Sequence, residues 1–277
     1  MIETSMYDAV EHNDIEAVRK YYTEEPGYLD ATSDGGYTIL MDAAKNGRLE
    51  IVQCLVDLGA NINADCEIID HYSDQRGTAI SFAFENFHHD VVKYLIQKGA
   101  DTETAYYYRE DEETPYSEPN VHRTCFMYAM DRSELELLEL MLQHGFNING
   151  YNALLSDNNE ETTPLFYAIA EIKPEMVNWL LEHGADPLQC VKMYEVGEIN
   201  ALMFAVNRGL TKEYKTDNWF KIVELLLKAG VDLTVTFDEL DGQTLPDLIL
   251  EDGNERYLQL FGLKNIKEKI EQEEEID

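Results

Sequence analysis

The chain has 277 residues, and its 55 aspartates and glutamates outnumber its 21 lysines and arginines, for a formal net charge of −34. A surface of that sign repels nucleic-acid phosphate and anionic lipid, so we expect neither as a partner. No apolar run approaches the ~18 residues of a membrane helix, and Met1 opens no basic or hydrophobic segment, so we expect a cytoplasmic protein.

The first predicted element is a helical hairpin in residues 4–32. Tyr7 and Val10, followed by Ile15 and Val18, place apolar side chains at helical spacing. We interpret this segment as a degenerate unit that caps the N-terminal end of a repeat array.

The pattern is complete in the second unit, residues 33–65. Thr38 is a candidate N-cap for a first helix, whose apolar stripe begins at Leu40. Gly47 breaks the chain, a second apolar stripe follows, and Gly59 ends the second helix as a left-handed cap. The unit is therefore predicted to be two helices joined by a turn.

The same pattern returns along the chain. The interval from Thr38 to Gly59 is 21 residues, and it recurs from Thr78 to Gly99, from Thr124 to Gly145 and from Thr163 to Gly184. Such regularity indicates one copied and stacked supersecondary unit. We assign the later units to residues 73–105, 119–151, 158–190, 195–235 and 239–262.

The C-terminal part of the array departs from the pattern. In the sixth unit the interval grows to 30 residues, from Asn200 to Gly230, and we place the nine additional residues between its helices, around 210–218. Residues 239–262 are expected to cap the C-terminal end, and residues 271–277 to form an acidic tail.

These motifs resemble the ankyrin repeat, whose signatures are Thr-Pro-Leu-His-x-Ala-Ala and Gly-Ala-Asp-x-Asn. Thr163-Pro164-Leu165 and Gly59-Ala60-Asn61-Ile62-Asn63 match best, while the motif histidine is replaced by Met41, Ser81, Met127 and Phe166. The resemblance implies an all-α repeat solenoid of about seven stacked ankyrin repeats, each a helix-turn-helix plus a hairpin finger, including degenerate caps at both ends. We expect a single ankyrin-repeat domain over residues 1–270.

The spacing between repeats varies where the family places its fingers. Successive threonines, and Asn200 after them, lie 40, 46, 39 and 37 residues apart, whereas an ankyrin unit has about 33. The longest insert, Tyr106–Glu118, interleaves tyrosines with carboxylates, which suits recognition of a Lys/Arg-rich partner through cation–π contacts and charged hydrogen bonds. Long loops that drift freely, with tyrosines covering exposed core edges, are the alternative.

The resemblance also implies that the ends of the first helices face a concave groove: Lys45 and Asn46, Glu85 and Asn86, Asp131 and Arg132, Ala170 and Glu171, Asn207 and Arg208. From the fingers and these helix ends we predict a partner-binding set. Its members are Tyr37, Asp70, Tyr72, Asp74, Glu85, Tyr106, Tyr107, Tyr108, Glu110, Asp111, Glu112, Glu113, Tyr116, Asp131, Tyr151, Asp157, Glu160, Glu171 and Tyr194.

Catalysis, a metal site and a cofactor are not expected. The four cysteines are scattered without the paired spacing of a disulfide framework or zinc site, which favours reduced thiols. His88-His89-Asp90 could suggest metal ligands, but in the ankyrin register it begins a second helix, which favours solvated turn histidines.

We therefore predict a non-enzymatic protein-binding module, a monomer on its own. The charge suggests a basic partner, for example a nucleic-acid-targeting toxin that this chain neutralises as an immunity protein. A generic scaffold or adaptor whose acidity is incidental is the alternative, and its binding would survive raised ionic strength.

Overall fold

The computed structural model describes residues 2–24, 29–33, 36–70, 73–103, 106–108, 121–150, 153–154, 161–193, 197–210, 216–231 and 244–274. They belong to two compact units, which we take separately. Unit 1 comprises Met1–Asn147 and Asn152–Asn159, and unit 2 comprises Ile148–Tyr151 and Glu160–Asp277.

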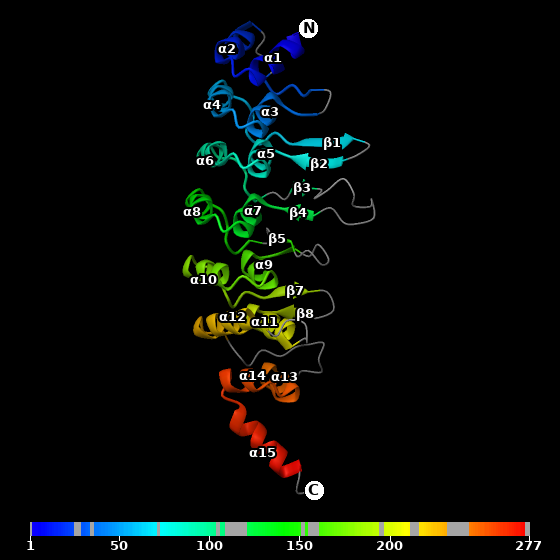
Figure 1. Cartoon of the computed structure of the whole chain (residues 1–277), viewed down its shortest axis with the longest axis vertical. Coiled ribbons are helices and arrows are strands. Elements are labelled where there is room, and N and C mark those ends of the chain that lie inside the picture. The colour runs from blue at the N-terminus through cyan, green and yellow to red at the C-terminus, as the bar shows by residue number, and fades with distance from the viewer. Residues whose placement is uncertain are drawn as a thin grey trace. The chain divides into compact units, whose positions relative to one another are not determined.

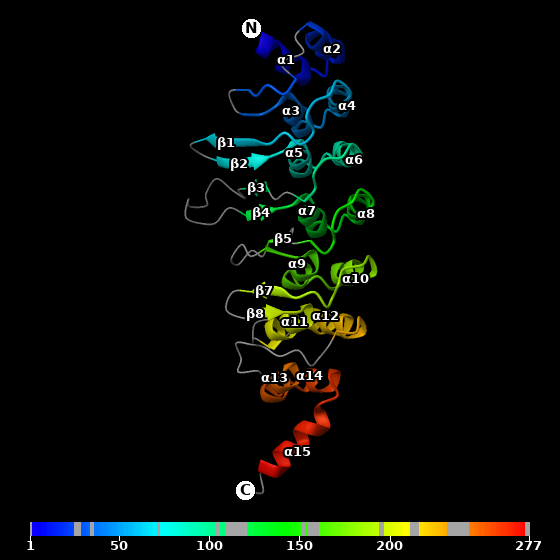
Figure 2. The same ribbon diagram turned by 180° about the vertical axis from the view of Figure 1, so that it is seen from behind.

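The described part of unit 1 is built from helical hairpins, each a first helix followed by a second helix. The pairs are α1 (Ile2–Glu11) with α2 (Ile15–Glu24), α3 (Ile39–Lys45) with α4 (Leu49–Asp57), α5 (Ala79–Glu85) with α6 (His89–Gln97), and α7 (Cys125–Asp131) with α8 (Leu135–Gln143). The first helices pack against one another in one layer and the second helices in another (Figures 1 and 2). The helical hairpins predicted from the repeat are confirmed.

The core of unit 1 lies between these layers. The stripes predicted for the second unit are buried, since Leu40, Ala44, Ile51 and Leu55 are each 2 % exposed or less. Burying a leucine or isoleucine contributes about 1.5–3 kcal/mol, whereas alanine contributes little but lets neighbouring helices approach closely. The repeated alanines of the first helices therefore set the spacing of the stack.

The helix ends follow the predicted chemistry in part, since Thr163 precedes α9 without a side-chain cap hydrogen bond. The Thr38 Oγ1 accepts a hydrogen bond from the backbone N–H of Met41, and the Thr124 Oγ1 accepts one from that of Met127, both at 3.2 Å. Gly59, like the other repeat glycines, has a positive φ, here 98°, which only glycine adopts without strain.

The fingers of unit 1 form a sheet that the sequence did not reveal. Strand β1 (Cys66–Asp70) pairs with β2 (Ser73–Gly77), and β3 (Tyr106–Tyr108) pairs with β4 (Val121–Arg123), both antiparallel. Arg76 of β2 is also in register with Tyr107 of β3, so two successive fingers join into one four-stranded sheet. The strands project on the side of the first helices (Figure 1). Strand β5 (Ala153–Leu154) is also in this unit.

Side chains link successive turns by binding the carbonyls left open at helix ends. The Arg48 Nη2 donates to the carbonyl of Glu11 at 3.1 Å, and the His88 Nε2 donates to that of Lys45 at 3.0 Å. The His88 ring leaves no room for a Cβ at Gly47, which also has a φ of 65°. Glycine is thus required at this turn by both backbone and packing.

A second set of links lies in the loops after the second helices. The Asn63 Oδ1 accepts from the backbone N–H of Asp101 at 2.9 Å, and the Glu103 Oε1 accepts from that of Asn147 at 2.7 Å. A loop side chain in each repeat thereby satisfies a backbone donor in the next.

Unit 2 continues the plan. Its elements are β6 (Glu161–Thr162), α9 (Pro164–Ala170), α10 (Pro174–Glu182), β7 (Val191–Met193), β8 (Gly197–Ile199), α11 (Ala201–Leu210), α12 (Asp217–Lys228), α13 (Leu245–Asp252), α14 (Glu255–Leu260) and α15 (Lys264–Glu274). Strands β7 and β8 form an antiparallel finger.

The sixth unit differs from its prediction. Helix α11 has 10 residues and α12 has 12, whereas the other helix pairs from α3 to α10 have 7 and 9. The additional residues therefore lie largely in longer helices rather than in the connection alone.

The C-terminal end also differs. Helices α13 and α14 form the predicted capping hairpin, but α15 follows and extends to Glu274, so it includes the start of the segment assigned as an acidic tail. Across the described ranges, no helix is both long enough and apolar enough to cross a membrane.

Candidate functional site

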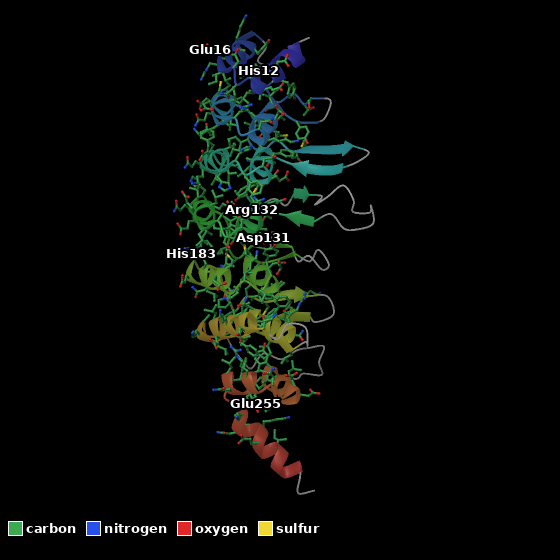
Figure 3. The ribbon with its side chains drawn as sticks, in the orientation of Figure 1. His12, Glu16, Asp131, Arg132, His183 and Glu255 are labelled. Atoms are coloured by element: carbon green, nitrogen blue, oxygen red, sulfur yellow. The ribbon has the colours of Figure 1, made fainter. Side chains whose placement is uncertain are left out.

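Two residues of the predicted contact set, Glu85 and Asp131, lie at the ends of first helices in unit 1. Lys45, Glu85 and Asp131 are the last residues of α3, α5 and α7, which pack side by side. We call these three residues, with the following Asn46, Asn86 and Arg132, the helix-end row. Figure 3 labels Asp131 and Arg132 at the end of α7.

Glu85 stands at the centre of this row. Its side chain is half-buried, and burial raises the pKa of its carboxyl from 4.5 to about 7, although Lys45 and Arg132 lower it in part. Among the described residues, no hydrogen bond or ion pair within 4 Å reaches this carboxylate. Among the described residues, Glu85 is therefore an acceptor whose charge is only partly compensated.

Lys45 is held to one side of Glu85 by an aromatic ring. Its Nζ lies 4.9 Å from the centroid of Tyr37, and Tyr37 packs at 5.1 Å against Phe82. The Tyr37 carbonyl accepts from the Tyr7 hydroxyl at 2.9 Å, which ties the backbone at Tyr37 to α1. Lys45 thus contacts the Tyr37 ring and also lowers the pKa of Glu85 through its charge, and both of these partners are in the predicted set.

Arg132 is held on the other side. Its Nη1 donates to the Phe84 carbonyl at 2.9 Å, and its guanidinium carbon lies 4.2 Å from the Phe87 centroid and 5.6 Å from the Tyr128 centroid. Because these contacts direct the guanidinium to a carbonyl and two rings, it compensates Glu85 only as a neighbouring charge.

The remaining predicted residues are distributed elsewhere. Glu171 follows α9 in unit 2, where it is the C-cap. Asp70, Asp74 and Tyr106–Tyr108 lie in the finger strands of unit 1. Ten others fall outside the described residues and stay predictions: Tyr72, Glu110, Asp111, Glu112, Glu113, Tyr116, Tyr151, Asp157, Glu160 and Tyr194.

One residue of this region was missed by sequence reasoning. Phe87 occupies the turn position held by Gly47 one repeat earlier, has a φ of 62° and is 65 % exposed. The signal was available in the sequence as an aromatic residue where the repeat requires a left-handed backbone.

The described residues contain no group of three or more histidines, cysteines, aspartates or glutamates that could hold a metal ion. His88 donates to a carbonyl, and His89 Nε2 lies 3.3 Å from Glu134 Oε1, so this pair makes structural contacts. Cys54, Cys66 and Cys125 are buried thiols, and the Cys190 thiol is exposed.

A stack of helical hairpins in which first helices pack on first helices and second helices on second helices defines a helical repeat solenoid. A family model for ankyrin repeats in three copies matches residues 6–106 and 112–190. The chain belongs to the ankyrin repeat family, whose repeats are protein–protein interaction modules.

Three similar proteins illustrate the likeness. The chain is 27 % identical over 172 residues to the ankyrin repeat and KH domain-containing protein mask-1 of Caenorhabditis elegans; the match covers 62 % of this chain but 5 % of that protein. The ankyrin repeat domain of Bcl-3 superposes with a TM-score of 0.59 at 20 % identity, over 88 % of this chain and 92 % of that one.

The third is a bacterial complex. A chain in the structure of the predatory endopeptidase Bd0816 from Bdellovibrio bacteriovorus with immunity protein Bd3460 superposes with a TM-score of 0.50 at 25 % identity. It covers 81 % of this chain and 97 % of that one.

Proposed function

We propose that this protein is a non-enzymatic inhibitor or immunity protein, monomeric and cytoplasmic, that binds a partner with a basic surface. The contact surface comprises the helix-end row and the enlarged fingers. Free thiols, three of them buried, suit a reducing compartment.

One observation carries the proposal: the under-compensated carboxylate of Glu85. Burying a carboxylate without an ion-pair partner costs free energy because the charge loses contact with water. A cation of the partner placed beside Glu85 would offset part of that cost. The formal charge of −34 supports the same sign of partner, because it accelerates association with cationic surfaces.

The immunity role has separate support in the Bdellovibrio complex, which contains an immunity protein. The protein bound to the immunity protein in that complex is an endopeptidase, so the idea of a nucleic-acid-targeting toxin rests on charge complementarity alone. In that version the acidic surface would occupy a cationic active-site cleft in place of phosphate.

Affinity capture from the native lysate tests the proposal, with the immobilised chain as bait and increasing NaCl for elution. We expect basic proteins that elute as salt screens the interaction. The Glu85→Gln bait should retain them less well than wild type, and Glu139→Gln, an equal change of charge on the outer helix α8, should retain them as wild type does.

A captured toxin can then be expressed with and without this chain. Growth restored by co-expression supports the immunity role. Capture of neutral or acidic proteins alone, with retention indifferent to salt and to Glu85→Gln, contradicts the proposal and favours the scaffold alternative.

A further inference from the structure

A surface recess lies between two successive turns of unit 1. It has a volume of about 290 Å³, and its lining includes Gly47 and Leu49 from one turn and Phe87, His88, His89 and Asp90 from the next. A recess of this size accommodates one side chain rather than a helix or strand. It lies beside the helix-end row but includes none of the predicted contact residues.

Phe87 lines this recess although its backbone conformation is unfavourable for an aromatic residue. A φ of 62° disfavours an aromatic residue, and a phenylalanine that is 65 % exposed gains little from burial. Gly47 and Ser133 fill the same position in the neighbouring repeats, so the turn itself does not need a ring.

The Phe87 ring already has one cationic partner within this chain. The Arg132 guanidinium lies 4.2 Å from its centroid, so the ring acts as a cation–π acceptor within this chain. The recess adds aliphatic surface from Leu49 and an exposed carboxylate from Asp90. The imidazoles of His88 and His89 are already engaged, with the Lys45 carbonyl and with Glu134.

We propose that this recess receives an arginine side chain of the protein partner. The aliphatic stem would lie along Phe87 and Leu49, and the guanidinium would reach the Asp90 carboxylate. The net charge of −34 favours a cationic occupant over an anionic one. This inference rests on the proposed function, to which it adds a specific anchor.

The test uses the full chain and three small probes followed by backbone amide NMR. N-acetyl-arginine methylamide should give saturable shifts at residues 47–49 and 87–91. Its uncharged analogue, N-acetyl-citrulline methylamide, should bind at least about threefold more weakly, because it carries no charge to pair with the Asp90 carboxylate. N-acetyl-leucine methylamide should also bind more weakly.

Variants separate binding from folding. Phe87→Asn should abolish the arginine shifts while its unfolding temperature stays at or above that of wild type, since Asn13 already adopts a φ of 54° in this chain. Phe87→Tyr keeps the ring and should keep binding. Ile172→Asn, a change at the same strained turn position in unit 2, should leave probe binding unchanged.

Three results would overturn the inference: absence of arginine shifts at these residues, equal affinity for the leucine probe, or undiminished arginine binding by Phe87→Asn. Capture of a basic protein equally by wild type and Phe87→Asn would overturn the anchor and leave the proposed function standing. Failure to capture any basic protein would instead contradict the proposed function, whatever the probes show.

Discussion

At the scale of single residues, Glu85 is a half-buried carboxylate at the end of α5 whose charge lowers folding stability. Burial disfavours its charged form, and the two flanking cations are drawn toward aromatic rings instead of the carboxylate. An ionised Glu85 therefore lowers the stability of the free protein, and a cationic partner would relieve that cost.

This cost predicts a pH-dependent stability difference for Glu85→Gln. The folded pKa of about 7 exceeds the ordinary value of 4.5, so between those pH values the folded protein keeps a proton that the unfolded chain releases. The contribution of Glu85 to the free energy of unfolding therefore falls as pH rises between these two pKa values and is constant above the higher one. Above pH 7 the variant should be more stable than wild type by on the order of 1–3 kcal/mol.

Urea denaturation of wild type and Glu85→Gln at several pH values from about 5 to 8 measures this difference. Glu139→Gln makes the same charge change at an exposed site and should show only a small difference. A Glu85→Gln difference that does not grow with pH would contradict the burial of this carboxyl.

A second residue-scale relation concerns Gly209 and Tyr257 in unit 2. A Cβ on Gly209 would overlap the hydroxyl of Tyr257, and Tyr257 is fully buried. Among the described residues this hydroxyl has no hydrogen-bond partner. The absence of a side chain at Gly209 thus makes room for a polar group that gains little there.

Gly209→Ala should destabilise the protein by about 1–3 kcal/mol through overpacking, even though alanine is the better helix former. Tyr257→Phe should be nearly neutral because it removes an unpaired hydroxyl, and it should relieve most of the penalty of Gly209→Ala. A double-mutant cycle by urea denaturation measures the coupling. Simple additivity of the two changes would show that the overlap is relieved in another way.

At the scale of elements, loop side chains connect one hairpin to the next. In unit 2 the Asn149 Oδ1 accepts from the Asp186 N–H at 2.8 Å, and its Nδ2 donates to the Gly184 carbonyl at 3.1 Å. A single amide side chain thereby satisfies both a backbone donor and a backbone acceptor beyond the end of α10.

Asn149→Ala should therefore destabilise unit 2 by roughly 1–3 kcal/mol, since it leaves both backbone groups without this partner. The midpoint of urea unfolding, followed by the fluorescence of Trp179 and Trp219, reports the loss. Asn178→Ala provides the control, because this exposed amide bonds only to the exposed Glu182 side chain among the described contacts and should change stability by less than about 0.5 kcal/mol. Equal effects of the two changes would contradict the bridging role of Asn149.

At the scale of the whole molecule, the net charge of −34 is the dominant electrostatic fact. Charges of one sign repel in the folded protein and are further apart in the unfolded chain, so the folded state is destabilised at low ionic strength. Raising NaCl from about 10 to about 200 mM should increase the unfolding temperature, because the Debye length contracts to below about 10 Å.

Thermal unfolding in NaCl and in choline chloride separates screening from specific cation binding. The two salts should act alike if screening is responsible. An unfolding temperature that falls with salt would show that local ion pairs outweigh the net repulsion.

The sequence by itself determined the helical hairpins, their caps and the family. Helix periodicity, an N-capping threonine such as Thr38 and a left-handed glycine such as Gly59 are signals carried by residues a few positions apart. These signals are local and repeated, and the structure confirms the helices that they predict. The structure differs from the prediction in α11, α12 and α15, where the sequence no longer follows the repeat.

Only the tertiary structure decided how the repeats act together. The pairing of Arg76 with Tyr107 joins two fingers, and the environment of Glu85 depends on Lys45 and Arg132 from the repeats on either side. Phe87 was visible as an unusual turn residue, but its exposure and its stacking with Arg132 were not. Desolvation and ring contacts depend on neighbours distant in the chain, and no local pattern encodes those distances.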